Sequence, residues 1–162
     1  MQQDLKSKKT QDLILNKSFE LFYRKGFNKT TIPDIMKETS LSKGAFYHHF
    51  KNKKEVGKKV INGIITNRIL NGFINPLMDY KNKNIPELIL NIFTERIKHF
   101  SEKEKLQGCP ANNLINEIGC NESEFRVLLR SLMDNWIDVL SKTITEGVKA
   151  KQISKNVNPK AL

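Results

Sequence analysis

Apolar side chains recur along this 162-residue chain at intervals of three and four positions, which is the spacing of one face of an α-helix. The first such segment is TQDLILNKSFELFYRKG, where Ile14, Phe19 and Phe22 lie at helical spacing. Gly26 at its end can adopt the left-handed conformation that terminates helices. No segment in this region has the alternation typical of a strand. The pattern therefore predicts an all-α fold.

Two shorter helices are predicted between residues 31 and 50, each with a residue that can cap its first turn. Thr31 is a suitable N-cap, and Asp34 three positions later resembles the second member of a capping box. Ser42 is placed to cap the next helix, on which Phe46 and Phe50 are four residues apart and share one face. We expect these phenylalanines to anchor that helix in the core.

The periodic segments become longer from about residue 53, after a further cap at Asn52. KKEVGKKVINGIITNRILNGFINPLMDY is periodic up to Pro76, and NIPELILNIFTERIKHF predicts a second long helix. A short helix is expected in GCPANNLINEIG. The last helix, from Glu122 to about Ala150, carries more apolar surface than one core-facing stripe requires. We expect it to pack on its own domain and on a second subunit.

The net charge of +11 changes the picture because it is concentrated at one end. Residues 1–59 hold 14 of the 28 basic residues but only 6 of the 17 acidic ones, which leaves +8 there and +3 in the remainder. The many Lys, Asn and Ile residues would also follow from an AT-rich coding sequence, so the distribution is more informative than the total. A basic first third indicates a nucleic-acid partner.

Several other classes of protein find no support in the sequence. No apolar run approaches the roughly 18 residues of a membrane span, and the polar start lacks the apolar core of a secretory signal, so we expect a cytoplasmic protein without a membrane partner. Cys109 and Cys120 lie outside any CxxC or HExxH pattern, and we expect two buried thiols rather than a metal site or a disulfide. No catalytic residue or cofactor is predicted, so the chain is not expected to be an enzyme.

The segment SLSKGAFYHHFKNKKEV presents an outward face with particular chemistry. Lys43 and Tyr47 lie about 100° around the helix from the phenylalanines, so they should face outward together. Gly44 costs roughly 1 kcal/mol in a helix relative to Ala, so another backbone or a phosphate is expected to come close to it. His48 and His49 are adjacent and point about 100° apart, which suits a shared metal ion poorly. A short, rigid, outwardly basic helix is suited to the DNA major groove.

With these features, TTIPDIMKETSLSKGAFYHHFKNKKEV resembles the helix-turn-helix segment of the tetracycline-repressor (TetR) family of bacterial transcription regulators. The shared pattern is a small residue followed by Lys, Gly, Ala, Phe, Tyr, His and Phe, and then Asn and Lys. The resemblance covers about the first 60 residues. One departure is the turn between the two helices, which is often Ala-Gly in the family and is Thr39-Ser40 here.

The resemblance implies a three-helix DNA-binding domain at residues 1–52 and a helical-bundle domain for ligand binding and dimerisation at residues 53–162. It also implies a homodimeric repressor that binds a palindromic double-stranded DNA operator and is released by an unknown small-molecule effector. The family usually continues beyond Asn158-Pro159 into another helix of the dimer interface, and we expect that helix to be missing here. Two alternatives stay open: the chain is a fragment, or its dimer is built with less helix than usual. The open alternative is a helical interaction module or a small enzyme without DNA binding.

The family's DNA contacts transfer to individual positions of this sequence. The residues that the resemblance implies, and that we expect to donate to phosphates, are Thr31, Tyr47, His48 and Lys53. The residues close enough to base edges to read sequence are Ser42, Lys43, Gly44 and Ala45. For the lysines at positions 51, 53 and 54, a solvated charge run is the open alternative.

The effector site is expected inside the regulatory domain, as a mostly apolar cavity. Its expected lining is Phe73, Met78, Phe93, Ile97, Asn113, Glu117 and Trp136. A carboxylate in apolar surroundings would favour a cationic or hydrogen-bond-donating compound. Two alternatives stay open: Glu117 can lie on the wet side of its helix, and aromatic residues at helical spacing can be plain core. The dimer interface is expected to include Leu129 and Trp136.

Overall fold

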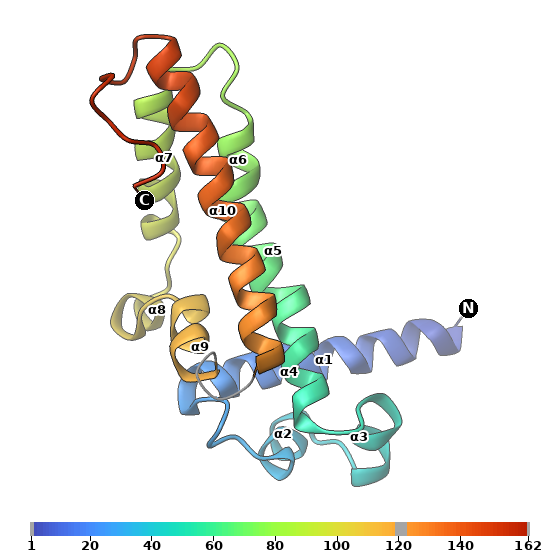
Figure 1. Cartoon of the computed structure of the whole chain (residues 1–162). Coiled ribbons are helices and arrows are strands. Elements are labelled where there is room, and N and C mark those ends of the chain that lie inside the picture. Colours follow the sequence, from blue (N-terminus) through green and yellow to red (C-terminus); the bar gives the residue numbers. More distant parts are fainter. Residues whose placement is uncertain (1, 119–122, 162) are drawn as a thin grey trace. The chain divides into compact units, whose positions relative to one another are not determined.

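The computed structural model describes residues 2–118 and 123–161, and all of its regular elements are helices (Figure 1). This confirms the predicted all-α fold. The helices form two compact units. The first comprises Met1–Ile65 and Cys109–Leu129, and the second comprises Thr66–Gly108 and Arg130–Leu162.

The first unit contains the predicted helix-turn-helix. Its helices are α1 (Gln2–Lys25), α2 (Ile32–Thr39), α3 (Lys43–His49), α4 (Lys53–Val60), the π-helical η1 (Ile61–Ile65), α9 (Pro110–Ile118) and the start of α10 (Ser123–Lys149). Helix α1 contacts α2, α4 and α9. The fully buried side chains at the centre of this unit include Ile14, Leu21, Ile35, Phe46, Phe50, Ile61 and Phe125.

The helix boundaries in this unit follow the capping residues that the sequence predicted. Thr31 accepts a hydrogen bond from the Asp34 N–H at 3.2 Å, and the Asp34 carboxylate accepts the Thr31 N–H at 2.9 Å, which completes the capping box. Ser42 caps α3 through the Ala45 N–H at 3.2 Å. Asn52 caps α4 in the same way. These bonds satisfy N–H groups that have no partner inside the helix.

In the first unit, Gly26 and Ser40 each end a helix with a positive φ. Gly26 has φ +86° and terminates α1, as predicted. Ser40 has φ +55° at the end of α2, and its N–H reaches the carbonyl groups of Met36 and Lys37. The turn that is often Ala-Gly in the family therefore has a serine here in the left-handed conformation that normally favours glycine.

The second unit consists of one helix that a π-helical turn interrupts (α5, η2 and α6), followed by α7, α8 and most of α10. The elements are α5 (Thr66–Ile69), the π-helical η2 (Leu70–Ile74), α6 (Asn75–Met78), α7 (Ile85–Lys98) and α8 (Glu102–Gln107). The helix continues past Pro76, where periodicity predicted its end. The Asn75 N–H bonds to Leu70 O, five residues back, and this wider turn gives room to a proline that would clash in a regular α-helix.

Two further expectations concern the cysteines and the start of the last helix. Cys109 is exposed in the connector before α9, so the prediction of a buried thiol is wrong there, while Cys120 lies outside the described residues. Helix α10 begins at Ser123, and the predicted start at Glu122 also lies outside them. Residues 150–161 form turns, in which Asn158 accepts the Lys160 N–H at 3.0 Å.

Candidate nucleic-acid interface

Helix α3 has one face in the core and one face in solvent. Phe46 and Phe50 are 0% and 1% exposed and anchor the helix, whereas Tyr47 is 44% exposed. The Phe46 and Tyr47 rings meet edge to face, with centroids 5.4 Å apart. This contact with a buried ring restricts the orientation of the Tyr47 side chain. A short helix that is fixed at its cap and along its buried face can present its outer side chains in a defined geometry.

The structure exposes most of the residues that the sequence assigned to DNA. The exposed members are Thr31, Ser42, Lys43, Gly44, Tyr47 and His48. Ala45 is half-buried. Among the contacts made by the described residues, none occupies the ammonium group of Lys43, which leaves it available to an anionic or hydrogen-bond-accepting partner.

Gly44 is not required by packing within the protein. Apart from its two chain neighbours and the backbone of its own helix, a Cβ atom added at this position would have no described atom within 4 Å. A glycine in the first turn of α3 lowers the stability of the helix, and no contact within the described protein requires it. This leaves room for an external group at the N-terminal end of the helix.

The two histidines differ in environment. Their rings meet edge to face with centroids 5.0 Å apart, and His48 is exposed whereas His49 is half-buried. Burial, with a smaller contribution from the neighbouring His48, lowers the pKa of His49 below its usual range. In residues 2–118 and 123–161, no group of His, Cys, Asp and Glu side chains could hold a metal ion.

Ion pairs hold α1 against α2 close to the capping box. Arg24 pairs with Glu38 at 2.9 Å, and Lys25 pairs with Asp34 at 3.0 Å. The hydrogen bond from the Thr31 N–H and the nearby Lys25 lower the pKa of Asp34 to about 2. The carboxylate that caps α2 is therefore charged at neutral pH.

Lys53 has a structural position that sequence reasoning missed. Its ammonium donates to the carbonyl oxygens of Phe27 and Thr30, each at 2.8 Å, and to that of Asn28 at 3.3 Å. It also lies 4.5 Å from the centre of the Phe27 ring. Burial lowers the pKa of Lys53, while the charge of Glu117 opposes that shift. A phosphate contact by Lys53 stays a prediction, but in this structure its ammonium binds the turn after α1.

The residues expected at the effector site fall in both units. Phe73, Phe93 and Trp136 form an aromatic cluster in the second unit, with Phe73 centroids 4.9 Å from Trp136 and 5.6 Å from Phe93. Met78 and Ile97, in the same unit, are largely exposed. The other two expected residues, Asn113 and Glu117, are on α9 in the first unit.

Arg96 is a neighbour of this cluster that the sequence did not indicate. Its guanidinium carbon lies 5.8 Å from the centre of the Phe73 ring and 5.7 Å from that of Phe100. Arg96 also lines a groove of about 450 Å³ together with Asn71, Gly72, Pro76, Leu88, Asn91, Ile92, Glu95 and His99. The buried Nε of Arg96 and Nε1 of Trp136 have no hydrogen-bond partner among residues 2–118 and 123–161.

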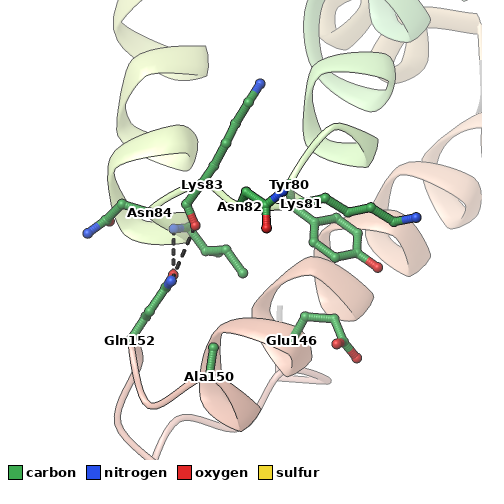
Figure 2. Close-up of a pocket in the computed structure, with 9 residues that line it drawn as sticks. Tyr80, Lys81, Asn82, Lys83, Asn84, Glu146, Ala150 and Gln152 are labelled. Atoms are coloured by element: carbon green, nitrogen blue, oxygen red, sulfur yellow. Dashed lines mark hydrogen bonds between the residues drawn. The ribbon is translucent and has the colours of Figure 1, made fainter.

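A second, more polar pocket of about 590 Å³ lies at the loop before α7 (Figure 2). Gln152 spans it: its amide oxygen accepts the Ile85 N–H at 2.7 Å, and its amide nitrogen donates to Lys83 O at 3.2 Å. In Figure 2 the side chains of Lys81 and Lys83 extend away from this link. These two hydrogen bonds of Gln152 hold the loop that lines the pocket, and we assign the pocket no ligand.

Two family models match the chain. The one described as bacterial regulatory proteins of the tetR family covers residues 14–58, and the tetracyclin repressor-like C-terminal domain covers residues 87–162. None of the helices in the described part of the chain combines the length and hydropathy of a membrane span.

Individual proteins and structures agree with these matches. An uncharacterized HTH-type transcriptional regulator of Lactococcus lactis is 32% identical over 148 residues, which are 87% of this chain and 69% of that protein. The HTH-type transcriptional repressor DhaR of a Mycobacterium species is 23% identical over 149 residues, 92% of this chain and 72% of that protein. The crystal structure of regulatory protein TetR from Rhodobacter sphaeroides aligns with a TM-score of 0.77 at 22% identity, over 93% of this chain and 78% of the other.

Proposed function

The chain belongs to the TetR family of bacterial transcriptional regulators, and on this basis we propose that it represses transcription as a homodimer on a palindromic DNA operator. A small-molecule effector releases it. The protein works by binding rather than catalysis, in the cytoplasm where the operator DNA lies. The observation that carries this function is the division of α3, whose Phe46 and Phe50 are buried while Lys43 and Tyr47 face solvent.

The roles of the exposed residues follow from their chemistry. Tyr47 and His48 are exposed side chains with one donor, which suits phosphate oxygens and fixes the register on the duplex. The Thr31 hydroxyl donates to the Asp34 carboxylate at 2.9 Å in this structure, so its phosphate contact stays a prediction. Ser42, Lys43, Gly44 and Ala45 are at the N-terminal end of α3, the part of a recognition helix that enters the major groove. Lys53 supports this surface from within, through the three carbonyl groups that it binds.

Substitution of Lys43 and Tyr47 tests this surface. We expect Lys43→Ala to weaken operator binding about tenfold and to reduce the salt dependence by about one ion, because one positive charge leaves the interface. Tyr47→Phe removes one hydroxyl and should cost on the order of 1 kcal/mol of binding free energy. The measurement is a gel shift at several salt concentrations, on an operator selected by the unmodified protein from random duplexes.

Lys142→Ala is the matched control, because it removes the same charge from an exposed position on α10. It should leave sequence-specific affinity within about twofold. If Lys43→Ala and Tyr47→Phe both bind the operator as tightly as the unmodified protein at every salt concentration, α3 does not dock on DNA.

For the effector we propose a compound with an apolar or aromatic body and a hydrogen-bond-accepting or anionic group, bound at the cluster of Phe73, Phe93 and Trp136. The expectation of a cationic compound rested on Glu117, whose carboxylate instead accepts two backbone N–H groups. Arg96 and Trp136 both lie against Phe73, and each has a buried N–H to which the described part of the chain offers no acceptor. An acceptor that pairs with such donors recovers the cost of their burial.

Benzoate, benzamide and benzylammonium form a matched series for this test. Trp136 is the single tryptophan of the chain, so its fluorescence reports binding at the cluster. We expect benzoate to bind most tightly, and Arg96→Met to weaken benzoate at least tenfold and benzamide by a smaller factor, because benzoate loses a charged pair and benzamide only a neutral hydrogen bond. Arg130→Met on α10 is the control. Tightest binding of benzylammonium, or equal loss in both arginine variants, would contradict the anionic preference.

A further inference from the structure

Helix α9 places a carboxylate at the end of α1. The two oxygens of Glu117 accept the backbone N–H groups of Phe27 at 2.9 Å and Asn28 at 3.0 Å. These two residues follow Gly26, which turns the chain in the left-handed conformation. Consecutive N–H groups that point to one side form a concave site for an anion, and here the anion is a side chain from 90 residues further along the sequence.

Gly26 is matched to this carboxylate in two ways. Its φ of +86° is one that side chains disfavour, and its N–H closes α1 by bonding to Phe22 O at 2.9 Å. A Cβ atom at this position would lie only 2.5 Å from an oxygen of Glu117. Any other residue would therefore have to displace the carboxylate as well as strain the turn.

The same turn is held from its opposite side by Lys53. The ammonium binds the carbonyl oxygens of Phe27, Asn28 and Thr30, while the Thr30 hydroxyl donates to Gly26 O at 2.7 Å. The N–H groups of the turn thus face a carboxylate and its carbonyl groups face an ammonium. The next residue is Thr31, the N-cap of α2, so the turn sets where α2 begins.

Side-chain packing supports the same connection. The ring of Phe27 meets Phe125 of α10 edge to face, with centroids 5.2 Å apart. Both rings lie against Gly57 of α4, where an added Cβ would come within 2.8 Å and 2.9 Å of them. Glu124 pairs with Lys54 and Lys58 of α4. Residues 109–129 thus form one compact unit with the helix-turn-helix, although the C-terminal family model contains them.

We propose that Glu117 is a positioning residue for operator recognition, which holds the turn of residues 26–30 so that α2 and the recognition helix α3 meet the DNA in the correct register. This role rests on the proposed DNA-binding function. It assigns α9 to the DNA-binding head, by which we mean the compact unit that contains the helix-turn-helix, in addition to any part that α9 has in effector binding. Glu117 does not touch DNA in this role, and its effect is transmitted through Thr31 and α2.

The charge of Glu117 makes the test sharp, because electrostatics alone and the positioning role give opposite results. Loss of a negative charge from a DNA-binding protein should strengthen binding to any duplex. If Glu117 positions the head, Glu117→Gln should weaken operator binding at least tenfold while affinity for a scrambled duplex stays equal or rises. Asp12→Asn is the control: it loses the same charge from an exposed position of α1 in the same unit, and both affinities should stay equal or rise.

Amide hydrogen exchange supplies a readout that does not depend on DNA. In the free protein, Glu117→Gln should accelerate exchange of the Phe27 and Asn28 amides at least tenfold, and Asp12→Asn should not. Glu117→Asp keeps the charge on a shorter side chain and provides a second variant if the glutamine variant unfolds. It should show an intermediate loss of operator affinity.

Each outcome has a defined meaning. Faster exchange together with a selective loss of operator affinity supports the role. Unchanged exchange shows that the contact is not formed. Faster exchange with operator affinity equal to that of Asp12→Asn shows that the contact does not position α2 and α3. Either result overturns the proposed role. If the unmodified protein selects no DNA, the proposed function itself fails, and the exchange data show separately whether the contact exists.

Discussion

At the scale of single residues, Gly44 separates the demands of folding from those of binding. Its position in α3 is open, so a methyl group meets no other residue. We expect Gly44→Ala to raise the free energy of unfolding by about 0.5–1 kcal/mol, because alanine restricts the unfolded chain and favours the helix. The same methyl group would occupy space that we assign to DNA, so operator affinity should fall several-fold.

Urea unfolding and operator binding, measured on the same preparations, check this pair of effects. Ala45→Gly is the reverse change at the neighbouring position and should lower stability. A Gly44→Ala protein that is more stable and binds the operator with unchanged affinity would show that DNA does not approach this part of α3.

The hydrogen-bonding residues that sequence reasoning placed correctly are those whose partners are local. Thr31, Ser42 and Asn52 each bond to an N–H three residues ahead, so spacing alone reveals them. Lys53 and Glu117 were assigned elsewhere because their partners are 23–26 and 89–90 residues away. Charge and spacing in the sequence do not record such distant partners.

At the scale of elements, the start of α2 depends on a carboxylate whose charge is sensitive to acid. The pKa of Asp34 is lowered from 3.8 to about 2 by the Thr31 N–H and by Lys25. A carboxyl group with a lowered pKa in the folded state contributes stability above its unfolded pKa and loses it as the pH falls through the folded value. This contribution should therefore be complete above about pH 5 and disappear between about pH 4 and pH 2.

We expect Asp34→Asn to be less stable than the unmodified protein at pH 6, with a difference that shrinks steadily from pH 4 to pH 2. Urea unfolding across this range measures it, and Asp12→Asn, at an exposed position of α1, is the control. A difference that stays constant down to pH 2 would show that the charge of Asp34 does not stabilise α2.

Helices were predicted well where apolar periodicity and caps agree, and less well where packing decides. Pro76 was expected to end a helix, but the wider π-helical turn before it lets the helix continue. Helix α7 was found from its pattern, yet Leu90 and Ile97 on it are exposed. Periodicity shows that a side chain belongs to an apolar stripe. It does not show what covers that stripe.

At the scale of the whole molecule, the sequence predicted the family and the basic head, because both depend on a local motif and on charge counts. It did not predict that residues 109–129 join the compact unit of the head. That arrangement depends on Phe27, Phe125 and Glu117, which meet only after the chain has folded back on itself. Long-range packing of this kind leaves no periodic signal.

Assembly is the remaining property at this scale, and burial changes which residues are expected to mediate it. Leu129 is only 2% exposed and Trp136 belongs to the aromatic cluster, so both are used within their own chain. On α10 the side chain of Ile137 is 41% exposed. We therefore propose that Ile137, rather than Leu129, contributes to the homodimer surface.

The unmodified protein should sediment as a dimer, and Ile137→Lys should shift it to monomers with unchanged helix content. A two-fold interface contains the residue twice, so two buried isoleucines lose about 3 kcal/mol or more of association free energy, at least a hundredfold in affinity. Operator binding should fall with it, because a monomer contacts only one half-site. Asn135→Lys adds the same charge at an exposed polar position and should remain dimeric, whereas Leu129→Lys should lose helix content instead. A monomeric unmodified protein that binds a palindromic operator at full strength would rule out the homodimer, and a dimeric Ile137→Lys protein would place the interface elsewhere.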